Sequence, residues 1–169
     1  MSLVPVSMMG LKDFHEYAIQ PELYRYLEFP PFESLAESRT YLGKLIDRSS
    51  APEAQYWFIQ LSENGKIVGS IGLHSFDSLR RSVEIGYGVS PDYWGRGVFK
   101  GAAGMLIDYA FEELLLHRIV ARTPIQNLAS IRGLEGLGFS KEGIMRDYYR
   151  HHTGGWWDSV LLSKLSTDK

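Results

Sequence analysis

Cysteine is absent from this chain of 169 residues. Without thiols the chain has no disulfide framework, Fe–S cluster, thiolate zinc site or cysteine nucleophile. The absence also agrees with a reducing compartment. We therefore expect a cytoplasmic protein whose chemistry depends on other side chains.

An excess of one charge and long hydrophobic runs are missing too. Lys and Arg total 18 against 20 Asp and Glu, a formal net charge of −2, whereas a dedicated duplex-DNA binder is normally strongly basic. No stretch approaches the ~18 consecutive apolar residues of a membrane span, and the first residues lack the basic region of a signal peptide. We expect no nucleic-acid partner and no membrane anchor.

Composition and patterning predict one domain over residues 1–169, of the α+β class. Hydrophobic residues make up 44% and charged residues 22%, near the average for globular proteins. A chain of this length can bury about two-thirds of its unfolded surface. No internal repeat or interdomain linker interrupts it. We expect a mostly antiparallel sheet with helices packed against it.

The N-terminal half predicts helices followed by a strand meander. Two short helical pieces over 10–28 are interrupted before Pro21, because the residue before proline avoids the helical region. Ser34-Leu-Ala-Glu37 is a capping box that begins a helix. Three antiparallel strands follow, and Asn64-Gly65 predicts a two-residue hairpin turn between the first two. The expected strands of this half are 3–6, 55–62, 67–73 and 83–89.

The C-terminal half predicts two helices and three strands. The first helix runs from the Gly-rich segment 93–102 to about Leu115, and Gly138 stops the second. A loop at Thr153-Gly-Gly155 joins the last two strands. The remaining elements are expected at 118–122 (strand), 127–137 (helix), 139 onward (strand) and 156–165 (strand).

The Gly-rich segment Gly95-Arg-Gly-Val-Phe-Lys-Gly101 connects a strand directly to a helix. Glycines let the backbone approach a ligand, and the free N–H groups at a helix N-terminus bind anions. A phosphate or pyrophosphate is the natural ligand. The spacing matches neither a P-loop nor a dinucleotide fingerprint, which would need glycine where Lys100 stands. A purely structural tight turn remains the alternative from these residues alone.

The order of motifs resembles the GNAT superfamily of acetyl-CoA-dependent N-acetyltransferases. Within it, the chain is similar to the branch of ribosomal-protein N-terminal (alanine/serine) acetyltransferases. The resemblance covers nearly the whole chain. Its motifs are Glu84-Ile-Gly-Tyr87, Trp94-Gly-Arg-Gly97, Ala110-Phe-Glu-Glu-Leu114, His117-Arg118, Asn127-Leu-Ala-Ser-Ile-Arg132, Leu137-Gly-Phe139, Glu142-Gly143 and Trp157-Asp158.

This resemblance implies a GNAT fold of about six to seven strands, splayed at the centre and flanked by about four helices. Pantetheine would lie in the splay beside Val89, and pyrophosphate on the amides of the Gly-rich segment. Phe99 departs from the family, which normally has Gly or Ala there. The implied cofactor-binding residues are Val89, Gly95, Arg96, Gly97, Val98, Phe99, Lys100, Gly101, Ala102, Asn127 and Ser130.

The residues near the thioester sulfur carry two interpretations. Asn127 and Ser130 suit the first turn of a helix for structural reasons alone. The resemblance adds that Asn127 contacts the cofactor and that Ser130 lies near its sulfur. Many relatives have a proton-donating tyrosine four residues after this serine, where this chain has Leu134. Ser130 is therefore the expected donor, ahead of Tyr148 or Tyr149.

Glu84 is the expected general base, acting directly or through water. It lies on a central strand, on the same side as Gly86 and Gly88, which leave room for a substrate. The alternative is a salt bridge to Arg118 or Arg122. His74 on the neighbouring strand is the other candidate base.

Other polar and aromatic residues carry weaker predictions. Adjacent His151 and His152 would point to opposite faces of a strand, so we expect no metal site there. Trp156 and Trp157, with the tyrosines before the loop, are expected to pack together or to wall the acceptor site. The resemblance places Arg25, Tyr26 and Phe32 over the acceptor channel.

The sequence therefore predicts acetyl transfer from acetyl-CoA to a primary amine by direct attack on the thioester. The oxyanion would be met by a backbone N–H near Val89. The resemblance suggests a protein N-terminal residue as acceptor. Alternatives are a small-molecule amine (antibiotic, polyamine or amino acid) and a non-catalytic acyl-CoA-binding module. A homodimer is expected only from the frequency of dimers.

Overall fold

The computed structural model describes residues 1–168. Within them, one seven-stranded sheet has the order β1-β2-β3-β4-β5-β7-β6. Its strands are β1 (Ser2–Pro5), β2 (Ala54–Gln60), β3 (Ile67–Asp77), β4 (Ser82–Val89), β5 (Arg118–Pro124), β6 (Ser140–Arg150) and β7 (Trp156–Leu165). Its α-helices are α1 (Leu11–Ala18), α2 (Leu35–Ser49), α3 (Val98–Asp108) and α4 (Leu128–Glu135). The predicted α+β class and strand number are confirmed.

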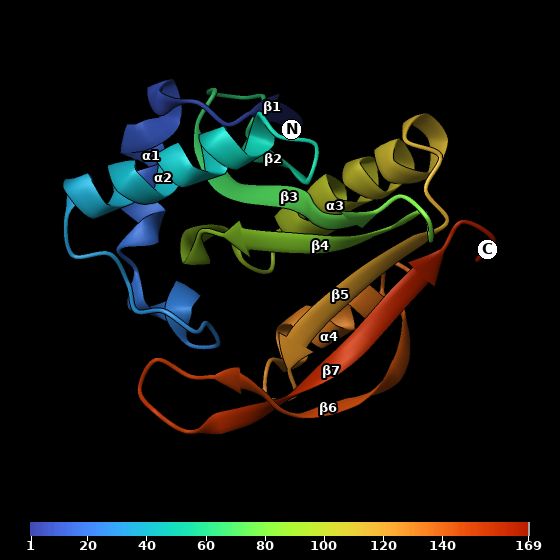
Figure 1. Ribbon diagram of the computed structural model, residues 1–169. Coiled ribbons are helices and arrows are strands. Elements are labelled where there is room, and N and C mark those ends of the chain that lie inside the picture. Colours follow the sequence, from blue (N-terminus) through green and yellow to red (C-terminus); the bar gives the residue numbers. More distant parts are fainter. Residues whose placement is uncertain (169) are drawn as a thin grey trace.

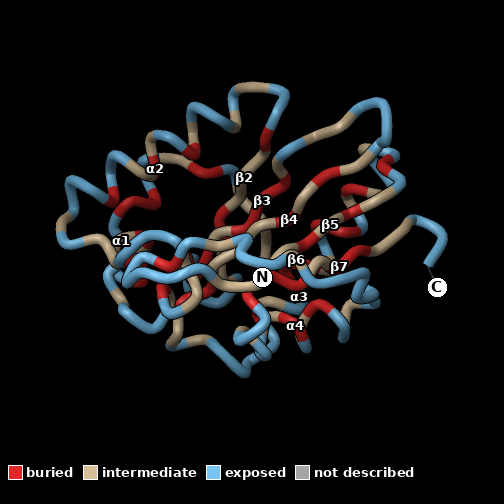
Figure 2. Tube along the Cα trace, turned by 60° about the horizontal axis from the view of Figure 1, so that its bottom comes forward, coloured by how far each residue is buried: buried red, intermediate tan, exposed pale blue. Residues whose placement is uncertain are grey.

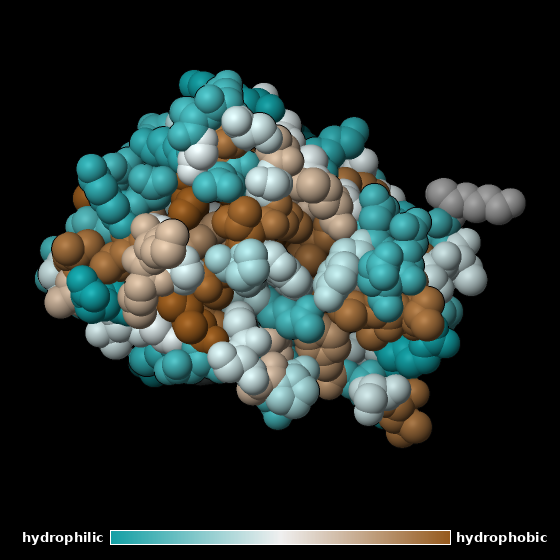
Figure 3. Space-filling model, turned by 90° about the horizontal axis from the view of Figure 1, so that it is seen from above, coloured by the Kyte–Doolittle hydropathy of each residue, from teal (hydrophilic) through white to brown (hydrophobic). Residues whose placement is uncertain are grey.

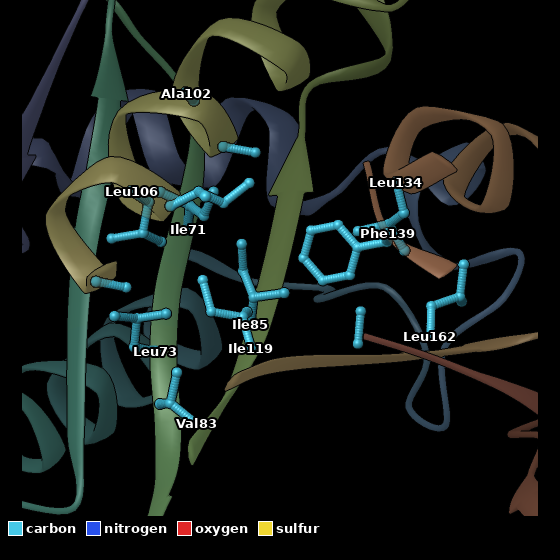
Figure 4. Close-up of a cluster of buried hydrophobic side chains, with 14 of the residues drawn as sticks. Ile71, Leu73, Val83, Ile85, Ala102, Leu106, Ile119, Leu134, Phe139 and Leu162 are labelled. Carbon is cyan, nitrogen blue, oxygen red and sulfur yellow. The ribbon is translucent and has the colours of Figure 1, made fainter. Parts of the chain in front are cut away.

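Helices cover both faces of the sheet, so the molecule has three layers (Figures 1 and 2). Helices α1 and α2 pack on one face against Phe58 and Ile67. Helices α3 and α4 pack on the other face, where the larger hydrophobic core lies. Figure 4 shows Ala102 and Leu106 of α3 near Ile71 of the sheet, and Leu134 of α4 beside Phe139 in the same core.

The helix signals of the first fifty residues are confirmed. Helix α1 ends before Pro21, and a 3₁₀ turn covers Pro21–Tyr24. Ser34 caps α2, since its Oγ accepts a hydrogen bond of 3.2 Å from the Glu37 N–H. In a capping box the Glu37 side chain would accept from the N–H of Ser34. Here Glu37 Oε2 accepts instead from the N–H of the preceding residue, Glu33, at 3.0 Å.

The predicted two-residue turn at Asn64-Gly65 is wrong. The Leu61 N–H donates to the Lys66 carbonyl at 2.9 Å, which closes a longer loop. Only Gly65 has a left-handed backbone, with φ of 72°, whereas a type I′ turn requires positive φ at both central residues. Asn64 instead stabilises the loop through its side chain, whose Oδ1 accepts from the Lys66 N–H at 3.0 Å.

The helix expected to continue to about Leu115 changes character before it ends. Helix α3 stops at Asp108, and a π-helical turn covers Tyr109–Glu113. The two helical segments keep Leu106 and Ala110 in the core. The predicted extent is thus confirmed, while the last turn is wider than an α-helical turn.

The sheet splits between β4 and β5, its one parallel pair in the described chain. These strands are in register only from Ser82 to Glu84 on β4, opposite Arg118 to Val120 on β5. Beyond Glu84 they diverge, as Figure 1 shows. The edge of β4 that faces β5 is therefore unpaired from Ile85 towards Val89, and the predicted splay is confirmed.

None of the helices in residues 1–168 is both long enough and apolar enough to cross a bilayer. In Figure 3, hydrophobic residues form several groups among hydrophilic ones.

Candidate active site

The loop between β4 and α3 has an open backbone surface. Gly95 and Gly97 have left-handed φ angles of 72° and 77°, which side-chain-bearing residues rarely adopt. A Cβ placed on either glycine would have no atom within 4 Å. The loop therefore presents bare backbone to the solvent at the N-terminus of α3.

The first turn of α3 offers free backbone donors beside this loop. Its first helical bond runs from the Gly101 N–H to the Gly97 carbonyl at 3.0 Å. The N–H groups of Val98, Phe99 and Lys100 therefore have no acceptor within the helix. Lys100 adds a cationic side chain, so this helix end suits an anion such as a phosphate group.

Not every residue of the predicted cofactor segment faces the loop surface. Val98 and Ala102 are buried in the core and offer only backbone. A Cβ on Gly101 would meet the Met1 side chain at 2.6 Å, so that glycine faces the N-terminus of the chain. Arg96 lies over the Tyr93 ring, with Cζ 5.4 Å from its centroid. The bare backbone of the segment is thus at its two left-handed glycines and the helix end, while Arg96 and Lys100 are exposed side chains beside them.

The end of β4 leads into this loop. The Val89 carbonyl accepts a hydrogen bond of 2.8 Å from Trp94 Nε1, and the Ser90 N–H donates to the Val68 carbonyl at 2.8 Å. These bonds fix the direction in which the chain leaves the sheet. Val89 therefore lies at the open end of the splay, as the sequence analysis predicted, with its carbonyl already engaged.

Tyr87, which the sequence analysis did not select, meets Ser130 across the splay. The Tyr87 and Ser130 hydroxyls are 2.7 Å apart, and Asn127 Oδ1 accepts from the Ser130 N–H at 3.2 Å. Burial raises the pKa of Tyr87 to about 12, although the bond to Ser130 opposes the rise. The phenol is thus protonated at neutral pH and can donate. Its sequence signals were its place in the motif Glu84-Ile-Gly-Tyr87 and the strand alternation that directs its side chain to the opposite face from Glu84.

Phe99 packs away from the loop surface and into the wall of the splay. Its ring centroid is 4.1 Å from that of Tyr87. On its other side lies Gly133 of α4, where a Cβ would come within 2.9 Å of Phe99 Cε1. Phe99 therefore fits because residue 133 is glycine, and its ring leaves Gly95 and Gly97 uncovered.

Glu84 lies on the opposite face of β4 from Tyr87 and forms an ion pair with Arg122 of β5. The side chains are 14% and 30% exposed, respectively. Burial raises the pKa of Glu84, and the Arg122 charge and hydrogen bond oppose this rise. The salt-bridge alternative is thus confirmed with Arg122, while Arg118 pairs with Glu142 instead. The pair leaves Arg122 Nε buried without a partner in the described chain.

A cleft of about 450 Å³ lies on this same face. It opens between the N-terminal segments and the strands β3 and β4, and aromatic residues form much of its wall. Its floor includes Gly86, Gly88 and His74, so the two glycines predicted to leave room do line a cavity. The rings that line it are Phe14, Tyr17, Tyr24, Phe29, Phe32, Tyr41 and Tyr56. Tyr87 also borders the cleft, although its ring packs against Phe99 on the other face of β4.

His74, the second candidate base, lines this cleft. It is the cross-strand neighbour of Glu84. Burial, with smaller contributions from the Arg48 and Arg122 charges, lowers the pKa of His74. The imidazole is therefore neutral at pH 7 and can accept a proton.

The hairpin between β6 and β7 contacts the segment that joins α1 to α2, other residues of which line the cleft. His151 Nε2 lies 3.2 Å from the Arg25 carbonyl, to which it can donate. The His151 ring stacks on Trp157 with centroids 4.0 Å apart, and Trp157 also meets the Tyr26 ring edge-on at 6.5 Å. Phe32 lines the cleft itself. The predicted cluster is confirmed only in part: Trp157 packs on residues from both ends of the chain, whereas Trp156 is exposed and Tyr148 and Tyr149 pair with each other.

Comparisons with known proteins agree on one family. Residues 2–140 match the family described as acetyltransferase (GNAT) domain. The "Uncharacterized N-acetyltransferase p20" of Bacillus licheniformis is 34% identical over 133 residues, covering 79% of this chain and 75% of that protein. The "Putative ribosomal N-acetyltransferase YdaF" of Bacillus subtilis is 39% identical over 84 residues, covering 50% and 46% of the two chains.

A solved structure supports the fold over nearly the full length. Spermidine N-acetyltransferase from Vibrio cholerae, in complex with CoA and spermine, superposes with a TM-score of 0.84 at 20% identity. The alignment covers 99% of this chain and 96% of the other. At this identity the likeness concerns the fold.

Proposed function

Because the chain belongs to the GNAT family of acetyl-CoA-dependent N-acetyltransferases, we propose that its acceptor is the α-amine of a protein N-terminus. The observation that carries this proposal is the ion pair between Glu84 and Arg122. Burial raises the pKa of Glu84, but Arg122 opposes the rise, so the carboxylate remains a weak base compared with an amine. An α-amine, with a pKa of about 7.7–8.0, is partly neutral at physiological pH, whereas a lysine amine at about 10.4 needs a stronger base.

The residues of the β4–α3 region fit acetyl-CoA. The backbone of Gly95 and Gly97 is bare, and the N–H groups that begin α3 suit a pyrophosphate. The unpaired edge of β4 offers N–H and carbonyl groups for the amide groups of a pantetheine arm. Val89 and Asn127 border that edge from the two sides of the splay.

Acetyl-CoA supplies an acetyl thioester, whose transfer forms an amide, releases a thiol and moves one proton from the amine to the sulfur. We assign Ser130 as the proton donor to the departing sulfur, with Tyr87 hydrogen-bonded to Ser130 behind it. The 2.7 Å hydrogen bond lets Tyr87 supply a proton to Ser130 as Ser130 donates its own. The pair would thus replace the tyrosine that relatives have where this chain has Leu134.

The group that accepts the proton from the amine is proposed to lie on the opposite face of β4. Glu84 is the proposed proton acceptor, and its cross-strand neighbour His74, which lines the cleft, is the other candidate. The two pKa values are shifted towards each other, that of the carboxyl upward and that of the imidazole downward. A pH profile alone would not separate them, so variants are needed.

Calorimetric titration with acetyl-CoA tests the cofactor assignment without knowledge of the acceptor. We expect binding by the parent and at least a tenfold weaker affinity in Gly97→Val, because a side chain at φ 77° distorts the loop. Gly104→Ala is the matched control, since its Cβ would have open space in the same helix. Equal affinity in both variants would remove the loop from the site.

A peptide acceptor with one α-amine and one internal lysine tests the acceptor assignment. We expect mass spectrometry to find the acetyl group on the α-amine, and we expect Ser130→Ala to lower kcat by about tenfold or more. Acetylation at lysine would overturn the α-amine proposal. Acetyl-CoA binding without transfer to any amine would favour the non-catalytic acyl-CoA-binding alternative.

A further inference from the structure

We infer that the acceptor carries an apolar group next to its amine, preferably an aromatic one, and that this group enters the cleft over β3 and β4. This inference rests on the proposed function. It names the chemistry of the acceptor's first residue, which the family resemblance leaves open between several amines. The cleft's walls, charges and floor each contribute to it.

The cleft wall is a pre-formed aromatic surface. Phe32 and Tyr41 have ring centroids 5.2 Å apart, and Phe29 lies 5.8 Å from Tyr41. Phe14 stacks on Tyr41 at 6.1 Å and an interplanar angle of 9°. Rings held by one another lose little conformational freedom when an apolar group binds between them. The volume of about 450 Å³ lies within the range of small-molecule sites.

The charges of the cleft do not complement a polycation. Among the described residues, its ionisable lining comprises Glu28, Arg48 and His74 besides the tyrosines. The lining thus contains one carboxylate and one guanidinium, so a chain of several ammonium groups would find too few partners. Aromatic rings also attract cations, yet Arg48 already lies over Tyr56, with Cζ 5.2 Å from the ring centroid.

A buried hydroxyl gives the cleft a polar anchor. Tyr17 lines it and is only 3% exposed. Its hydroxyl lies near Ser70, another lining residue, but makes no hydrogen bond of full geometry in residues 1–168. A buried polar group without a partner costs free energy, which a ligand can recover. A carbonyl one or two bonds beyond the amine would supply that partner, as every peptide N-terminus does.

The floor places the amine end at β4. A Cβ on Gly86 would come within 3.2 Å of His74 Nε2, and one on Gly88 within 3.6 Å of a Leu23 methyl. Side chains at these two positions would narrow the cleft at the strand that borders the splay. The amine can therefore reach β4, while the apolar group extends under the aromatic wall.

Peptides that differ only in their first residue test this inference in the unmodified protein with acetyl-CoA. The first residues are Phe, Leu, Ala, Asp and Lys, and spermidine is a further acceptor. We expect kcat/KM for Phe and Leu to exceed the values for Asp, Lys and spermidine by at least tenfold. Equal or better use of spermidine, Asp or Lys would overturn the inference and leave acetyl transfer intact. Transfer to none of these amines, with acetyl-CoA still bound, would overturn the proposed function itself.

A pair of variants locates the preference in the cleft. Phe29 is at its rim and 37% exposed. We expect Phe29→Ala to raise KM for the Phe peptide about tenfold, with the Ala peptide changed less than threefold, and Phe29→Leu to restore most of the loss. Leu79→Ala, 88% exposed and outside the cleft, is the control. An unchanged preference in Phe29→Ala, with binding of acetyl-CoA retained, would overturn the assignment.

Discussion

Glu84 and Tyr87 place two different chemistries on the two faces of one strand. Side chains alternate along a strand, so residues three apart point to opposite faces. Glu84 lies on the face that carries the cleft and pairs with Arg122. Tyr87 lies on the other face and pairs with Ser130. In the proposed mechanism a thioester in the splay beside β4 would reach both faces, so that one strand would receive a proton on one face and deliver a proton on the other.

Substitution of both partners in the ion pair separates a catalytic role of Glu84 from a structural one. We expect Glu84→Gln to lower kcat by about 10²-fold, the lower range for loss of a general base. Arg122→Gln breaks the same ion pair but keeps the carboxylate, so we expect a loss of less than tenfold. Steady-state kinetics with thermal unfolding as a folding control measures this. Equal losses would make Glu84 only the partner of Arg122.

The pH dependence of a His74 variant, compared with that of the parent, identifies which group accepts the proton. The pKa of His74 is lowered, so protonation inactivates it only below its ordinary value of about 6.5. The pKa of Glu84 is raised, so its acid limb lies above its ordinary value of about 4.3. We expect kcat/KM, expressed for the neutral form of the acceptor α-amine, to fall between these two values as the pH decreases. His74→Asn should keep this limb, whereas its loss in that variant would make His74 the base.

The contact between Phe99 and Gly133 predicts a reversal of sign in a double-mutant cycle. Gly133→Ala in a helix normally stabilises by roughly 0.5–1 kcal/mol, but here its Cβ would come within 2.9 Å of Phe99 Cε1. We expect it to destabilise by about 1–3 kcal/mol. In a Phe99→Ala background the same substitution should stabilise. Denaturant unfolding measures all four proteins, and stabilisation in both backgrounds would contradict the contact.

Helix α2 is the element that positions much of the cleft wall. It carries Tyr41, Leu45 and Arg48, and its N-terminus follows the segment that carries Phe29 and Phe32. The start of α2 therefore affects both a helix and the loop before it. The Ser34 side chain fixes that start through its bond to the Glu37 N–H.

Loss of this cap should cost measurable stability. We expect Ser34→Ala to lower the free energy of unfolding by about 1 kcal/mol, the usual cost of losing an N-cap. Thr40→Ala is a matched exposed control in the same helix and should change stability by only a few tenths of a kcal/mol, in the stabilising direction. Urea unfolding measures both. A Ser34→Ala variant as stable as the parent would contradict the cap.

At the scale of the molecule, segments from the two ends of the chain contact each other near the cleft. The segment that joins α1 to α2 contributes to the cleft lining, and the β6–β7 hairpin contacts it through His151 and Trp157 (Figure 1). The loop that follows β4 lies on the far side of this strand. Acceptor and cofactor regions therefore depend on different long-range contacts.

This separation predicts a selective kinetic effect. His151→Phe keeps a ring to stack on Trp157 but removes the donor to the Arg25 carbonyl. We expect a severalfold higher KM for the acceptor and an unchanged Kd for acetyl-CoA. His151→Ala, which removes the stack as well, should raise KM further. Kinetics and calorimetry together test this, and a parallel change in both constants would contradict it.

The elements were predictable where their signals are local. Pro21 interrupts the first helices and Ser34 begins α2, because both act through neighbouring backbone atoms. Asn64-Gly65 was misread because a two-residue turn depends on the register of β2 and β3 as well as on its own residues. The class and strand number followed from patterning and family resemblance together.

The sequence by itself determined the order of elements, the Gly-rich turn and the family, since these depend on residue type and spacing along the chain. Only the tertiary structure decided that Arg122 is the partner of Glu84, that Tyr87 meets Ser130, and that an aromatic cleft forms over β4. Each of these joins residues far apart in the chain. Their contact depends on where β4 and β5 separate and on how the segment between α1 and α2 packs over the sheet, which local propensity does not encode.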